Sequence, residues 1–74
     1  MHRLETSLQM ARRHVLENEL RIADQEAVLA RLKLCRAPAL EEVAEEMLRL
    51  FRRIQGQARD HLRRLERDES ANSS

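Results

Sequence analysis

The sequence predicts an all-α fold, a two-helix antiparallel hairpin of the coiled-coil type, and three observations lead to this expectation. Apolar residues recur at alternating steps of four and three along two stretches of the chain. The single proline, Pro38, separates the two stretches. Among the 74 residues, one glycine, one proline and one aromatic leave little material for turns or for a sheet. Because such stripes need an apolar partner, we expect two long helices packed on each other.

The first stretch predicts a helix over about residues 3–35. Two amides, Asn18 and Gln25, interrupt its apolar stripe, and they either fix the register of the hairpin or reach solvent at a loosely closed seam. The predicted seam of this helix consists of Leu4, Leu8, Ala11, Val15, Asn18, Ile22, Gln25, Leu29 and Leu32.

Pro38 marks the predicted turn. If the first stripe ran on through it, Arg36, Glu46 and Arg53 would enter the core, whereas the second stripe starts one residue out of phase. Proline suits the first turn of a helix and disfavours the α conformation in the preceding residue. Basic side chains before the turn and acidic ones after it complement the dipoles of the two helix ends. We therefore expect a turn at about residues 35–37.

The second stretch predicts a helix over about residues 38–68, which completes a single hairpin domain over residues 1–68. The last residues, 69–74, have no apolar anchor and are expected to form a disordered tail. Folding back at the turn sets Gln25 near Met47, and the two arms end together. The predicted seam of the second helix consists of Leu40, Ala44, Met47, Phe51, Ile54, Ala58, His61 and Leu65.

Further apolar residues lie beside both seams, and they predict self-association. A chain of this length builds only a small core, so burying them against a second hairpin in a homodimeric four-helix bundle is favourable. Singly exposed leucines, or a foreign protein that covers them, are the alternatives. The predicted interface consists of Leu16, Leu20, Leu34, Val43, Leu48, Leu50 and Leu62.

Composition and charge narrow the function classes. The net charge of +1 gives no global attraction to nucleic acid, and no apolar stretch is long enough to span a bilayer. No nucleophile motif, phosphate loop or cofactor motif is present, so we expect a non-enzymatic protein without cofactors. One cysteine and the lack of a signal-like run predict a cytoplasmic setting. A protein–protein interaction or regulatory module is therefore the first hypothesis.

Arginines on the second helix support the alternative, an RNA-binding or other nucleic-acid-binding bundle. Acidic residues at helical spacing dilute this patch, so a solvated face with ion pairs explains it as well. The arginines of this alternative are Arg49, Arg52, Arg53, Arg59, Arg63, Arg64 and Arg67.

Two minor candidates remain. His14 and Glu17 lie one helical turn apart, and the hairpin brings His61 near them, so the three form a weak candidate metal site against ordinary solvent-facing histidines. Cys35 at the turn either joins two chains, reacts as a thiol or is incidental.

The run His14-Val15-Leu16-Glu17-Asn18-Glu19, followed by Ile22 and Gln25, resembles a pattern of short uncharacterised helical-hairpin proteins in soil and plant-associated alphaproteobacteria. Their pattern is HV, two variable residues, Gly or Asn, then Glu, with I-x-x-Q following. The likeness covers about residues 14–65. It implies a hairpin fold and a bacterial cytoplasmic setting, and no catalytic activity.

Overall fold

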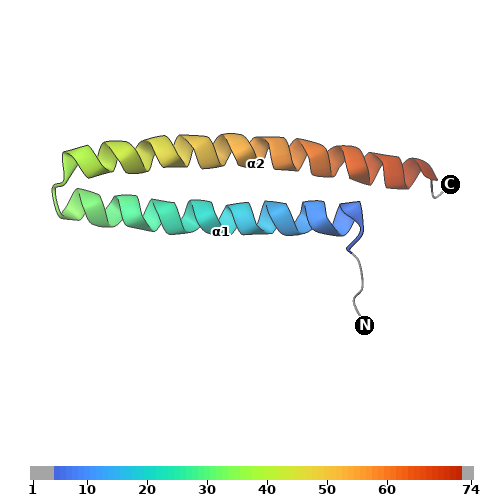
Figure 1. Cartoon of the computed structure of the whole chain (residues 1–74), viewed down its shortest axis with the longest axis horizontal. Coiled ribbons are helices and arrows are strands. Elements are labelled where there is room, and N and C mark those ends of the chain that lie inside the picture. The colour runs from blue at the N-terminus through green and yellow to red at the C-terminus, as the bar shows by residue number, and fades with distance from the viewer. Residues whose placement is uncertain (1–4, 73–74) are drawn as a thin grey trace.

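The computed structural model describes residues 5–72 as two antiparallel α-helices lying side by side (Figure 1). Helix α1 spans Ser7–Leu34 and helix α2 spans Pro38–Asn72. The molecule measures 56 × 29 × 13 Å. Its shortest dimension is close to the diameter of one helix, about 10–12 Å, so the hairpin is a single layer. The predicted all-α hairpin is confirmed.

A capping box starts α1 at Ser7, rather than near residue 3 as the sequence stripe predicted. The backbone N–H of Gln9 donates to Oγ1 of Thr6 over 3.1 Å, and the N–H of Thr6 donates to Oε1 of Gln9 over 3.0 Å. These bonds satisfy two N–H groups that the start of the helix leaves without helical partners. The predicted seam residue Leu4 lies outside the described residues.

The turn occupies residues 35–37, as predicted, and it is built without glycine. The N–H of Ala37 donates to the carbonyl of Leu32, and that of Arg36 donates to the carbonyl of Lys33, both over 3.2 Å. This pair of bonds is the Schellman ending of a helix, whose left-handed position glycine usually fills. Arg36 occupies that position with φ of 53°. Pro38 then opens α2, where the missing N–H costs nothing.

Helix α2 continues to Asn72, so the prediction of a disordered tail is wrong for residues 69–72. No glycine or proline follows Gly56, and the helical backbone bonds need no tertiary partner to continue. The absence of apolar anchors therefore does not show where this helix ends. The longer α2 projects beyond the start of α1, so the two arms do not end together (Figure 1). Residues 73–74 lie outside the described range.

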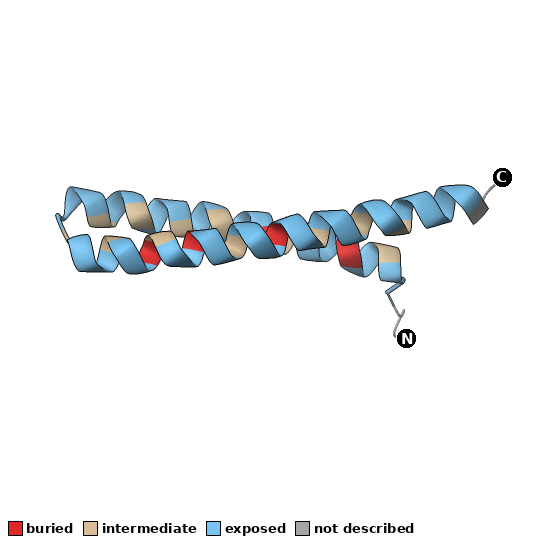
Figure 2. Cartoon of the chain, turned by 90° about the horizontal axis from the view of Figure 1, so that it is seen from above, coloured by how far each residue is buried: buried red, intermediate tan, exposed pale blue. Residues whose placement is uncertain are grey.

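The seam predicted for α1 is confirmed in the described residues, because Ala11 and Asn18 are buried and the others are half-buried. Gln25 reaches across it: its Nε2 lies 3.5 Å from the carbonyl of Ala44 and 3.7 Å from Sδ of Met47. Of the two interpretations of Gln25, the structure favours a role in register. Figure 2 shows the buried residues along the line where the helices meet.

The seam predicted for α2 is only half right. Ala44, Phe51, Ala58 and Leu65 face α1 as expected. The alternate positions are rotated by one residue, since Leu48, Gln55 and Leu62 face α1 in place of Met47, Ile54 and His61. Leu40, predicted to begin this seam, is 57% exposed.

Leu48 and Gln55 illustrate why this rotation is preferred. Leu48 is 3% exposed, whereas Met47 is 41% exposed. Gln55, also 3% exposed, donates from Nε2 to the carbonyl of Val15 over 3.0 Å. The rotation therefore leaves the apolar side chain of Ile54 partly exposed, and in its place the buried Gln55 makes a hydrogen bond between the two helices.

The resulting core is thin. Ala11, Ala44 and Leu48 are its buried apolar residues, and no large side chain among the described residues is fully buried. Two helices of this length supply little burial by themselves.

Candidate interaction surfaces

One flank of the hairpin is closed by a ladder of ion pairs between the helices. Arg12 lies 3.9 Å from Glu66, Glu19 lies 3.2 Å from Arg59, and Glu26 lies 3.7 Å from Arg52. Successive rungs are seven residues apart on both helices. The side chains are about half exposed, so each pair contributes little to stability. Their matched spacing nevertheless favours one register of the hairpin.

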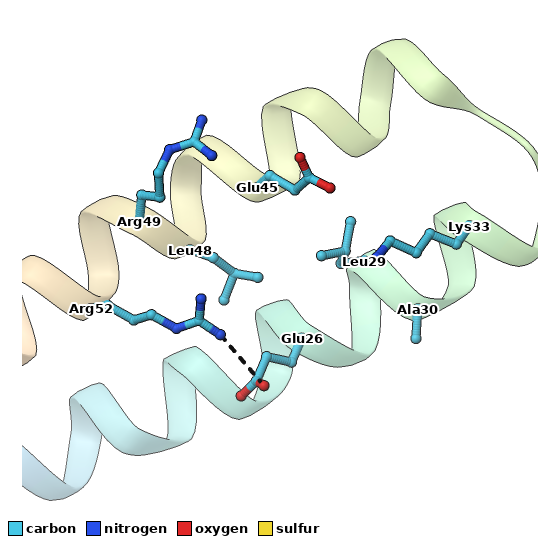
Figure 3. A pocket seen from close by; sticks show the side chains of 8 residues that line it. All are labelled: Glu26, Leu29, Ala30, Lys33, Glu45, Leu48, Arg49 and Arg52. Carbon is cyan, nitrogen blue, oxygen red and sulfur yellow. Dashed lines mark ion pairs between the residues drawn. The ribbon is translucent and has the colours of Figure 1, made fainter.

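A shallow hollow lies on this flank, at the end of the ladder nearer the turn (Figure 3). Leu29 and Leu48 lie between charged side chains from both helices, and the Glu26–Arg52 pair closes one side. Lys33 and Glu45 line it at the next heptad position. No serine, cysteine or histidine lines the hollow, so no hydroxyl, thiol or imidazole is placed there for nucleophilic catalysis.

The opposite flank carries what we call the apolar row. Its five side chains are 40–57% exposed, and they recur along α2 at steps of three and four. Val28 and Leu32 of α1 line a groove beside this row, together with three of its members. The apolar row consists of Leu40, Val43, Met47, Leu50 and Ile54.

The interface predicted from sequence is divided among three places. Val43 and Leu50 belong to the apolar row, whereas Leu48 is buried inside the hairpin and Leu62 is half-buried. Neither Leu48 nor Leu62 therefore offers a free surface to a second chain. The predicted interface did not include Leu40, Met47 and Ile54, because these three members of the row were predicted to lie in the seam. The rest of the predicted interface, Leu16, Leu20 and Leu34, is exposed on the side of α1 away from α2.

Two of the candidate metal ligands lie on the flank that carries the apolar row. His14 and Glu17 line a groove with Ile54, but His61 does not line it. Within residues 5–72, no three metal-ligating side chains cluster. Glu17 instead accepts a hydrogen bond from Arg13 over 2.8 Å. Hydrogen bonds from Arg13 to Glu5 and Glu17 raise the pKa of Arg13 above its ordinary value.

The candidate nucleic-acid arginines are all exposed, and a helix of 100° per residue gathers them within an arc of about 140° on α2. The middle of this arc lies about 150° around α2 from the centre of the apolar row, and Arg53 and Arg64 lie at the end of the arc nearest the row. Arg52 and Arg59 belong to the ladder, and Arg63 pairs with Asp60 within α2. Carboxylates therefore already neutralise part of the surface that a phosphate backbone would meet. The other members are Arg49, Arg53, Arg64 and Arg67.

Cys35 is exposed at the end of α1, and its N–H donates to the carbonyl of Arg31 over 3.0 Å. Neither helix has an apolar stretch of the length needed to cross a membrane, as judged over the described residues.

Comparison of the chain with protein-family models, with curated proteins and with solved structures finds no match. The function must therefore be inferred from the surfaces themselves.

Proposed function

We propose that the chain is a non-catalytic assembly module, which homodimerises into a four-helix bundle and serves as a protein–protein interaction or regulatory element. The observation that carries this proposal is the apolar row, five large side chains in a regular line on a hairpin with a thin core. Contiguous apolar surface of this kind marks interaction sites more often than scattered leucines do.

The free energy gained by covering the apolar row is comparable with the stability of a small domain. Each side chain of the row keeps about half of its surface in water, so covering it stabilises by about 1 kcal/mol. Five such residues on each of two chains amount to about 10 kcal/mol before the cost of association, against a typical stability of about 5–15 kcal/mol. A second hairpin therefore supplies the core that one hairpin lacks.

Thermal unfolding followed by circular dichroism tests the proposal. If the native state is a dimer, the melting temperature rises with chain concentration, because folding and association are coupled. Leu50→Glu places a charge in the middle of the row and is expected to remove this dependence and lower the melting temperature. A melting temperature that is independent of concentration in the unsubstituted chain would overturn the proposal.

A second candidate function is nucleic-acid binding, which the arc of arginines on α2 favours. It predicts RNA affinity that falls steeply with salt concentration, roughly with the number of phosphates contacted. Arg49→Gln and Arg53→Gln together are expected to weaken that affinity. Lack of RNA binding at low salt would exclude this function.

We also propose a bacterial cytoplasmic setting. The single cysteine and the resemblance of residues 14–65 to bacterial hairpin proteins support it.

A further inference from the structure

We propose that the occupant of the apolar row is α2 of a second copy of this chain, packed antiparallel about a two-fold axis that passes between Met47 and Leu50. The inference rests on the proposed function, and it specifies the face, the direction and the register of the dimer. Glu46 of each copy would then lie beside Arg53 of the other copy.

The spacing of the row is suited to self-pairing. A two-fold axis brings the same surface of each copy together, so the surface must be complementary to itself. With the axis between Met47 and Leu50, each Met47 faces the second copy's Leu50, and each Val43 faces the second copy's Ile54. Four apolar layers result, and Leu40 faces Gln57 at both ends, where Gln57 lies in the groove that Ile54 also lines.

Charges beside the row select this register over its neighbour. Glu46 and Arg53 lie seven residues apart along the same edge of the row, about 80–100° around α2 from its centre. In the proposed register, opposite charges meet at two equivalent places. A shift of one heptad that moves the two-fold axis toward the turn sets Glu46 beside Glu46 of the second copy and places Ile54 opposite Arg36, beyond the start of the helix. That shift pairs like charges and leaves an apolar residue uncovered.

The other surfaces of the hairpin are less suited to a second copy. The ion-pair ladder covers one flank with charges that are already paired. The outer side of α1 carries Ala23, Ala27 and Ala30 between its leucines, so it offers less apolar area than the row. Its neighbours Glu19 and Glu26 are held by arginines of α2.

A charge-reversal experiment on the full chain tests the register. Sedimentation equilibrium gives the dimer dissociation constant for the unsubstituted chain, for Glu46→Arg and for Arg53→Glu. Each single reversal converts two attractive contacts into repulsive ones, and we expect the dissociation constant to rise about tenfold at low salt. Mixing the two variants in equal amounts restores opposite charges at both contacts and should restore association. The double variant E46R/R53E should behave in the same way.

Glu42→Arg and Arg49→Glu provide the matched control. They reverse the same charges at the same seven-residue spacing, but about 120–140° from the centre of the row, and Arg49 lines the hollow on the ladder flank. These variants should change the dissociation constant by less than about twofold.

The outcomes distinguish the inference from the proposed function. If the unsubstituted chain dimerises but the reversals at Glu46 and Arg53 act no differently from the controls, or if mixing restores nothing, the register is wrong while self-association stands. If the chain stays monomeric at about 100 µM, both are overturned, and a foreign amphipathic helix becomes the occupant to seek.

Discussion

The buried amide of Gln55 allows a sharp prediction about stability. Its side chain is 3% exposed, and Nε2 donates to the carbonyl of Val15 over 3.0 Å. Its Oε1 is also buried, and it has no hydrogen-bond partner in the described part of the chain. Gln55→Met keeps nearly the same length and volume but removes both polar atoms.

The expected gain follows from three contributions. Removing an unpaired buried acceptor recovers about 1–3 kcal/mol of desolvation cost. Losing the hydrogen bond to Val15 costs about 0.5–1.5 kcal/mol, and that carbonyl keeps its own bond within α1. A buried thioether in place of the amide adds apolar burial. We therefore expect the free energy of unfolding to rise by about 1–2 kcal/mol.

Urea denaturation followed by far-ultraviolet circular dichroism at one chain concentration measures this change. Gln55→Glu should change the stability in the opposite direction, because it removes the donor and introduces a charge into the seam. It should lower the free energy of unfolding by about 2 kcal/mol or more at neutral pH. If Gln55→Met instead lowers the free energy of unfolding by more than about 0.5 kcal/mol, the amide is a net stabiliser, and the reasoning about its Oε1 fails.

Three further predictions concern the ends of α1 and the ladder. Arg36→Gly should raise the free energy of unfolding by about 0.5–1 kcal/mol in urea, because glycine adopts a φ of 53° without strain, and Arg36→Ala should not. Thr6→Ala should lower it by about 1 kcal/mol by removing the cap, and amide hydrogen exchange should then speed up in the first turn of α1. A double-mutant cycle with Glu19→Gln and Arg59→Gln should give a coupling of about 0.2–1 kcal/mol that disappears at about 1 M salt, and a larger, salt-insensitive value would contradict the exposed geometry of that pair.

The hairpin and its turn could be predicted because they depend on local signals. The stripe predicted to form the seam of α1 is the one that packs against α2, and Pro38 fixes the start of α2. The sequence also contains a signal for the start of α1 that the expectation of a helix from about residue 3 overlooked, since a threonine followed three residues later by glutamine is the signature of a capping box.

The rotation of α2 could not be predicted in the same way. Ala44, Phe51 and Ala58 belong to both heptad assignments. The two differ in their alternate positions, which are Leu40, Met47, Ile54 and His61 in the first and Glu41, Leu48, Gln55 and Leu62 in the second. Counting apolar residues favours the first assignment, whereas the structure adopts the second. The bond from Gln55 to α1 and the ladder depend on the other helix, so no pattern within α2 reveals them. This rotation is also what leaves the apolar row exposed.

Sedimentation equilibrium of the unsubstituted chain, over a concentration range reaching about 100 µM, tests most directly whether a second copy covers the apolar row. We predict a mass that approaches twice the 8.7 kDa of one chain. A mass that stays at that of one chain over the whole range would contradict self-association.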